Sequence, residues 1–160
     1  MIELMIVLLL CSIISAGLIM SMTSGRKSMY LADAQISIQG NLRNAMKQIL
    51  DDLRQSSHSQ ISFPADGNAY TNISFNISQG VSGSTISWSP NPITYALTAG
   101  QIIRNDGVQA TVLANNVTAM SFMRQTSATN IINVNLSVRK GTPLGDILNA
   151  SLSSAINLRN

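Results

Sequence analysis

The chain has 160 residues, which is enough for one domain together with a long helical arm. Only 11% of the residues are charged and 45% are apolar, and these proportions exclude a disordered chain. Aromatic residues make up 4% and there is a single cysteine, which excludes an intrachain disulfide and a multi-cysteine metal site. The net charge of +3 comes from scattered Lys and Arg rather than a clustered basic face, so we expect no nucleic acid contact.

Residues 1–25 contain one long apolar run in which Glu3 is the only charged residue. The stretch from Leu4 to Met22 reads LMIVLLLCSIISAGLIMSM, and a helix needs about 20 apolar residues to cross a bilayer. The run therefore predicts a retained membrane helix. A cleaved secretory signal, a lipoprotein site at Cys11 and a buried helix of a soluble protein are the alternatives. The side chains that we expect in the membrane or in a bundle of partner helices are Leu4, Ile6, Val7, Leu8, Leu10, Ile13, Ile14 and Leu18.

Residues 26–56 are expected to continue this arm as an amphipathic helix. Apolar residues recur at intervals of three or four positions, which is the spacing of one helical stripe. The opposite face is charged, and on it Lys47 and Asp51 are spaced to form a pair one turn apart. The side chains that we expect to pack the helix against the rest of the protein are Leu31, Ile38, Leu42, Ile49 and Leu53.

Residues 57–160 are rich in Ser, Thr and Asn and show the period-two alternation of β-strands. The expected strands are 73–77, 85–88, 93–98, 101–104, 110–113, 117–123, 134–138 and 155–158. Residues 101–113 read as a hairpin around Asp106-Gly107. The stretch 139–151, which contains two glycines and a proline, is predicted to be a mobile loop. The fold class that follows is α+β, a long N-terminal helix packed on a C-terminal antiparallel β-sheet body.

The side chains that support catalysis or metal binding are scarce in this body. His58 is the only histidine and lies in a polar stretch after the helix, so we interpret it as a solvated linker residue. Asp66 and Asp106 each precede a glycine and read as turn residues. The sequence contains no clustered calcium ligands, no phosphate-binding glycine loop and no nucleophile elbow. We therefore expect no cofactor, no metal site and no enzymatic activity.

Glu3 is chemically out of place at the head of the apolar run. A carboxylate costs about 2.5–3.5 kcal/mol at the centre of a bilayer and less near its interface. One interpretation is that Glu3 lies at the interface in contact with water. The other is that it pairs with a positive group once it is buried among other helices, and so sets the register between neighbouring subunits.

The segment from Ile2 to Val7 (IELMIV), followed by an apolar run and an amphipathic helix, resembles the N-terminus of type IV pilins and type II secretion pseudopilins. The stretch 41–55 (NLRNAMKQILDDLRQ) is similar to the helix end of two subgroups, the J-type minor pseudopilins and the W-type minor pilins. Further segments are similar to the same subgroups, namely 93–97, 101–104, 116–122 and 155–160.

This resemblance implies a non-enzymatic subunit with three parts: a membrane and filament-core helix (1–25), its amphipathic continuation (26–56) and an antiparallel β globular body (57–160). It implies insertion in the bacterial inner membrane as a single-pass protein with the body outside the cytoplasm. It further implies that the subunit then assembles through its N-terminal helix into a type IV pilus or type II secretion pseudopilus, at or near the tip of the filament.

The resemblance also implies the partners. They are other pilin or pseudopilin subunits, membrane lipid, an inner-membrane assembly platform and a prepilin peptidase, which would remove a basic leader upstream of Met1 and methylate the new N-terminus. Glu3 takes the place of the family's glutamate, which contacts the N-terminal amine of a neighbouring subunit. The alternative is a singly membrane-anchored extracytoplasmic binding module, such as an adhesin or a substrate-recognition domain.

Overall fold

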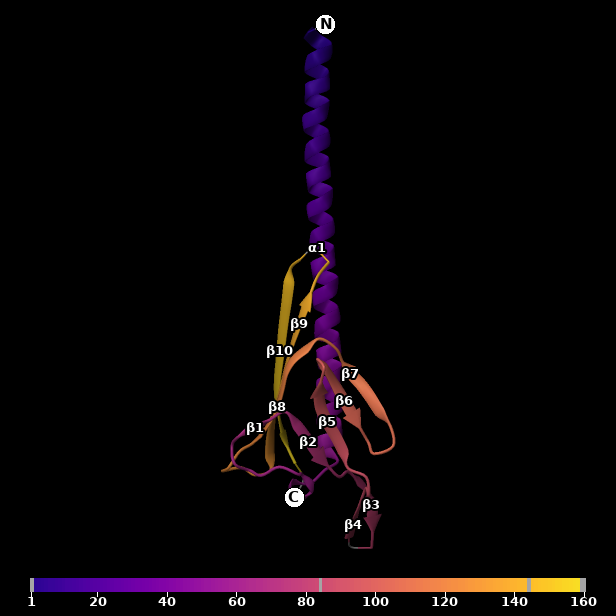
Figure 1. Cartoon of the computed structure of the whole chain (residues 1–160), viewed down its shortest axis with the longest axis vertical. Coiled ribbons are helices and arrows are strands. Elements are labelled where there is room, and N and C mark those ends of the chain that lie inside the picture. The colour runs from indigo at the N-terminus through magenta and orange to yellow at the C-terminus, as the bar shows by residue number, and fades with distance from the viewer. Residues whose placement is uncertain (1, 84, 144, 159–160) are drawn as a thin grey trace.

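A computed structural model describes residues 2–83, 85–143 and 145–158, so Met1 and the last two residues of the expected closing segment lie outside the described part. The chain forms one long N-terminal helix packed on a C-terminal antiparallel β body, which confirms the predicted α+β class (Figure 1). A short 3-10 turn, η1 (His58–Gln60), joins the helix to the strands.

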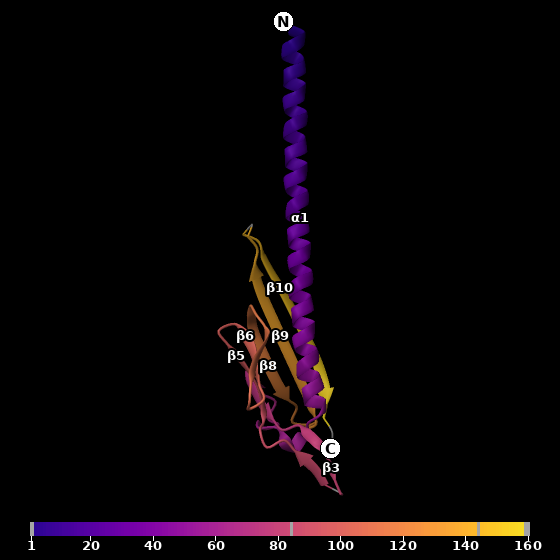
Figure 2. The ribbon, with the colours of Figure 1, turned by 90° about the vertical axis from the view of Figure 1, so that its right-hand side faces the viewer.

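The helix α1 runs without interruption from Ile2 to Arg54. Its 53 residues correspond to about 80 Å of length at 1.5 Å per residue. Two perpendicular views show a rod whose C-terminal half lies along the β body and whose N-terminal half projects away from it (Figures 1 and 2). No proline falls inside this range, so nothing in the sequence forces a kink.

The described strands form three antiparallel sheets. In the first sheet the order is β1-β8-β9-β10, in the second it is β2-β5-β6-β7, and β3 and β4 form a separate hairpin. The bounds are β1 (Ala69–Tyr70), β2 (Asn72–Phe75), β3 (Ser78–Ser82), β4 (Thr85–Trp88), β5 (Ile93–Thr98), β6 (Gln101–Asn105), β7 (Ala110–Ala114), β8 (Val117–Arg124), β9 (Ile131–Gly141) and β10 (Ile147–Asn157).

One hydrophobic core joins the C-terminal half of α1 to the two larger sheets. The helix packs chiefly on β10, with further contacts to β7 and β9. Four of the five expected packing residues are buried in this core, namely Ile38, Leu42, Ile49 and Leu53. Leu31 is only half-buried and lies outside the core, because only the end of the β9–β10 hairpin, where Asp146 contacts Lys27, reaches this part of the helix.

The hairpin expected around Asp106-Gly107 is confirmed as β6 and β7. The Asp106 carboxylate accepts hydrogen bonds from the main-chain N–H groups of Val108 and Gln109, at 3.0 and 2.8 Å. Gly107 has a positive φ of 84°, and a Cβ atom there would lie 2.6 Å from Cβ of Asn91. The turn therefore requires glycine at this position.

The prediction of a mobile loop over residues 139–151 is wrong for most of that range. Strand β9 continues to Gly141 and β10 begins at Ile147, so only a short turn separates two 11-residue strands. The Thr142 N–H donates to the Asp146 carbonyl at 2.8 Å and closes this turn. The strand expected at 155–158 is the end of β10.

Replacing Ile49 by Ala is expected to lower the free energy of unfolding by about 2–5 kcal/mol, because its side chain is fully buried between helix and sheets. The matched control is Ile36→Ala on the same helix, where the side chain is 69% exposed and a change within about 0.5 kcal/mol is expected. Urea unfolding of the full chain in detergent micelles measures both values. Equal effects would contradict the packing described here.

Candidate functional site

The N-terminal half of α1 is an apolar surface that the rest of the chain leaves uncovered. Within the described residues, α1 is the one helix long and apolar enough to cross a membrane, and its best 18-residue stretch has a mean hydropathy of 2.6 with none of it buried. The eight side chains expected in a membrane or helix bundle, from Leu4 to Leu18, are 52% to 66% exposed. Soluble proteins rarely expose contiguous apolar surface of this extent, so lipid or apolar partners have to cover it.

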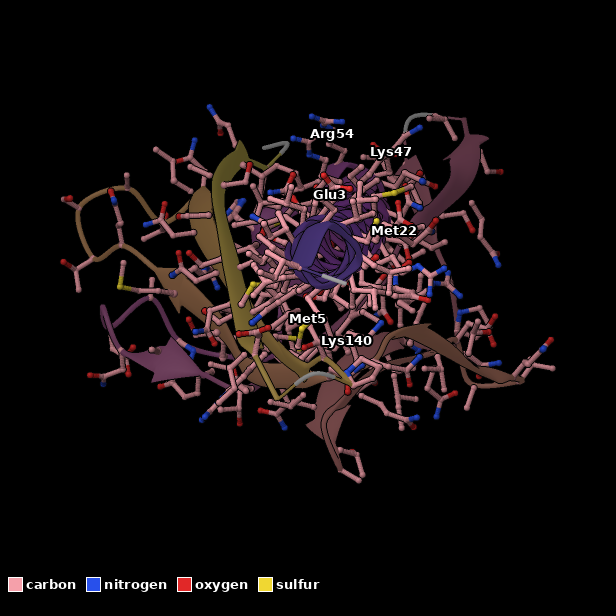
Figure 3. The ribbon with its side chains drawn as sticks, turned by 90° about the horizontal axis from the view of Figure 1, so that it is seen from above. Glu3, Met5, Met22, Lys47, Arg54 and Lys140 are labelled. Atoms are coloured by element: carbon pink, nitrogen blue, oxygen red, sulfur yellow. The ribbon has the colours of Figure 1, made fainter. Side chains whose placement is uncertain are left out.

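Glu3 is the one acid on this surface. Figure 3, which looks down the helix axis, shows Glu3 and Met5 projecting from opposite sides of α1. The neighbouring Ile2, Leu4 and Met5 are all exposed and apolar, and Glu3 has no ion-pair partner among residues 2–83, 85–143 and 145–158. Where this carboxylate is removed from water, none of the described residues supplies a cation to it.

The apolar run ends in a basic pair, Arg26 and Lys27, and there the helix meets the tip of the longest hairpin. The Lys27 ammonium lies 3.1 Å from a carboxylate oxygen of Asp146, in the turn between β9 and β10. Both side chains are partly exposed, so the pair contributes less than about 1 kcal/mol. Its importance is geometric, because it fixes the start of β10 beside α1 just beyond the apolar run.

At the other end of α1, Asp52 is buried and holds the helix to the second sheet. Its carboxylate accepts hydrogen bonds from the Tyr95 hydroxyl and from Nε of Arg104, both at 2.7 Å. Gln48 donates to the other carboxylate oxygen at 3.0 Å, and Arg104 also reaches Asp106 at 3.3 Å. Because every charge in the network has a partner, the burial is tolerated.

The pKa values in this network follow from its contacts. Burial, and secondly the Asp52 carboxylate, raise the pKa of the Tyr95 phenol well above its ordinary value. Burial alone would lower the pKa of the Arg104 guanidinium, but Asp52 outweighs it and the net shift is upward. The stabilisation from protonated Tyr95 is complete below the ordinary tyrosine pKa of about 10 and is lost only as the pH rises through the higher folded value. The contribution of Tyr95 to stability therefore does not change with pH in the neutral range.

The sequence analysis did not single out Asp52. The available signal was its position three residues after Ile49, which places it on the apolar stripe rather than on the charged face. The expected pairing of Lys47 with Asp51 also differs from the structure, in which Asp51 instead pairs with Arg54 at 2.8 Å.

A second buried cation, Arg124, ties the linker after the helix to strand β8. It donates to the main-chain carbonyls of Thr129, Phe63 and His58, at 2.9, 3.1 and 3.0 Å. His58 lies in the linker between helix and strands, as predicted, but it is half-buried and its Nδ1 atom is buried, so the prediction that it is solvated is wrong. The buried side chain of Arg124 thus places all three of its nitrogen donors on main-chain carbonyls, which is a structural role.

No protein-family model and no curated protein matches the chain. Within the described residues, His, Cys, Asp and Glu side chains nowhere gather in a group of three or more that could hold a metal ion. The candidate contact surface is the uncovered apolar helix with its single acid.

Replacing Asp52 by Asn is expected to cost about 1.5–3 kcal/mol of unfolding free energy, because the half-buried Arg104 would lose the nearer of its two carboxylates and keep only that of Asp106. Asp51→Asn is the matched control, since the adjacent, more exposed Asp51–Arg54 pair is worth about 1 kcal/mol or less. Urea unfolding of the full chain measures both, and equal losses would contradict the assigned roles.

Replacing Leu10 and Ile14 together by Arg is expected to release the chain from membranes, because each Arg costs about 2.5–3.5 kcal/mol within a span. The control is the double variant Met29→Arg/Ile36→Arg, which changes two equally exposed residues beyond the apolar run. The fraction of full chain that resists carbonate extraction is the measurement. Retention of the first variant at the level of the control would exclude residues 2–22 as the membrane-spanning part.

Proposed function

We propose that the chain is a non-enzymatic minor pilin or pseudopilin. It would be a membrane-inserted subunit that assembles through its N-terminal helix into a type IV pilus or type II secretion pseudopilus, at or near the tip. The observation that carries this proposal is Glu3, a lone acid in an uncovered apolar helix that continues unbroken into the core of the β body.

An ordinary membrane anchor needs only apolar length. An acid within it makes insertion into the bilayer less favourable and does not strengthen the anchoring. A subunit that moves from lipid into a bundle of helices needs the same apolar length, first against acyl chains and then against neighbouring helices. In such a bundle water is excluded, and an unpaired carboxylate penalises every arrangement that does not supply a cation. Glu3 would then select the register in which a neighbouring subunit's N-terminal amine reaches it, as the resemblance to the pilin superfamily implies.

The continuity of α1 supports the same proposal. Because the helix has no break between its exposed half and the core residues from Ile38 to Leu53, displacement of the arm would move the β body with it. A flexible tether would suit a binding module that samples space above a membrane. A rigid rod suits a subunit whose body has a defined place on the outside of a filament.

The remaining parts of the proposal come from the resemblance. The chain would be single-pass in the bacterial inner membrane with its body outside the cytoplasm before it enters the filament. Its partners would be other pilin or pseudopilin subunits, a prepilin peptidase that acts upstream of Met1 and an inner-membrane assembly platform.

The test is the pair of variants Glu3→Ala and Glu3→Gln in the full chain. We expect each to lower copurification with other pilin subunits of the same cell about tenfold or more, because the neighbour's cation would lose its partner. Membrane insertion and the unfolding free energy of the β body are expected to stay unchanged, since Glu3 lies far from the core.

Ser12→Ala is the matched control on the same arm, because Ser12 bonds only its own helix, to the Leu9 carbonyl at 2.8 Å. Undiminished copurification of both Glu3 variants would overturn the role of Glu3. It would favour the anchored binding module, with the acid at the interface in contact with water.

A further inference from the structure

Strand β10 forms a long outer edge of the first sheet. It lies last in the order β1-β8-β9-β10 and pairs with β9 over all 11 of its residues without a register shift. Among the described strands, the other sheet edges are shorter: β1 has two residues, β2 has four, and β7 has five and a bulge against β6. The β10 edge extends for about 36 Å at 3.3 Å per residue.

Two main-chain hydrogen bonds determine which main-chain groups face outward. The bonds from Thr142 N–H to the Asp146 carbonyl and from Leu158 N–H to the Asn130 carbonyl lie just beyond the two ends of the β9–β10 ladder. Because hydrogen-bonded pairs alternate along an antiparallel ladder, the even-numbered residues of β10 bond to β9. The odd-numbered residues, Ile147, Asn149, Ser151, Ser153, Ala155 and Asn157, therefore direct their N–H and C=O groups to the open edge.

This edge lacks the features that usually prevent pairing with other chains. Protected edges are short, bulged, charged or interrupted by proline, whereas β10 reads ILNASLSSAIN and has neither a charge nor a proline. Within the described residues, no hydrogen bond from another segment occupies the odd-numbered main-chain groups between Asn149 and Ala155. The edge is thus open to a further strand.

The inner face of β10 is also incompletely covered. In β9 the inward side chains, such as Val134 and Leu136, are fully buried. On the same face of β10, Leu148, Ala150 and Leu152 are only half-buried although they pack against the core, and they pair with Lys140, Val138 and Leu136 of β9. The helix covers these side chains from one direction and leaves them open at the edge, so an added strand would bury them further.

A cavity of about 230 Å³ lies along this opening, between helix and strand. It is lined by Gln39, Leu42 and Arg43 of α1 and by residues 149–152 of β10. Strand addition gains affinity from main-chain hydrogen bonds and specificity from pockets that take alternate side chains. The cavity is positioned to take one inward side chain of a strand added beside Asn149 and Ser151.

We propose that the β10 edge binds an extended segment of a different protein by strand addition. The chemistry of the edge defines the segment: about seven to ten uncharged residues, with apolar side chains at alternate positions facing α1 and small polar ones facing outward. The main-chain groups of the odd-numbered residues would hold it, and the half-buried Leu148, Ala150 and Leu152 would pack beneath it.

A second copy of β10 does not fit as this segment in antiparallel pairing, which is the arrangement of every strand pair in the described sheets. Strand β10 runs in the same direction as α1, from the Lys27–Asp146 contact toward the end of the helix (Figures 1 and 2). Antiparallel pairing of two β10 edges would point the two apolar arms in opposite directions. Subunits inserted in one membrane have parallel arms, so they cannot pair in this way. Only this exclusion of a second copy rests on the proposed function.

The test uses the full chain in detergent micelles and a synthetic peptide with the uncharged sequence of residues 131–138, IINVNLSV, with both ends capped. Residue-resolved amide hydrogen exchange is measured with and without the peptide. We expect the odd-numbered amides from Asn149 to Ala155 to slow about tenfold or more when the peptide binds. The even-numbered amides are already protected by β9 and are expected not to change. A peptide in which Asn133 and Val134 are both replaced by Pro is the control and is expected to protect neither set.

Two chain variants separate main-chain from side-chain recognition. Ser151→Pro/Ser153→Pro removes two outward N–H groups and none that bonds to β9, and it is expected to weaken binding of the labelled peptide about tenfold or more. Ser151→Ala/Ser153→Ala keeps those N–H groups and is expected to bind like the unaltered chain. If the proline variant does not fold, the exchange measurement on the unaltered chain still decides.

Absence of peptide-dependent protection at the odd-numbered amides would overturn the proposal. Protection that rises with protein concentration in the absence of peptide would also overturn it, because the occupant would then be a second copy. The same peptide response is expected from the Glu3→Ala chain, so failure of strand addition and failure of the assembly role of Glu3 are distinguishable.

Discussion

The burial of one stripe of α1 is the constraint on which the rest of the structure depends. From Ile38 to Leu53 the helix packs into the hydrophobic core, where strands of both large sheets contact it. The same helix then continues beyond the body with its apolar side chains uncovered. Because the C-terminal half of α1 is packed in the core, it cannot move independently of the β body. The exposed half continues the same helix and is therefore held rigidly relative to the body. The molecule is therefore a rod with a body attached at one end (Figure 2).

The end of the rod is fixed by polar as well as apolar contacts. Apolar packing of a helix on a sheet tolerates small sliding and rotation, because the contacts are individually weak and non-directional. The bonds from Tyr95 and Arg104 to Asp52 are directional, and they are formed at one position of the helix only. A buried ion pair is weak evidence for stability, but it does penalise alternative arrangements. Here it orients α1 relative to β5 and β6.

Much of the fold could be predicted from the sequence, and the failures have physical causes. The helix was predictable because its apolar residues repeat at 3.6-residue spacing over many turns. The first part of strand β10 was not, since its Ser, Asn and Ala residues carry little β-propensity and the preceding Gly141, Pro143 and Gly145 favour a loop. It forms because β9 supplies an 11-residue template and α1 packs against its inner face. Asp52 was missed because a buried charge is recognisable only once its partners, distant in sequence, are known.

The open edge and the uncovered arm have a common geometric basis. The Lys27–Asp146 contact starts β10 beside the end of the apolar run, so the strand edge runs along the body in the direction set by the helix. A segment added to this edge would lie alongside the rod, with its position fixed by hydrogen bonds rather than by a flexible loop. Binding on β10 and assembly through Glu3 would use different surfaces of one rigid body. A segment bound to the β10 edge would then have a defined position relative to the helices or lipid that cover the N-terminal half of α1.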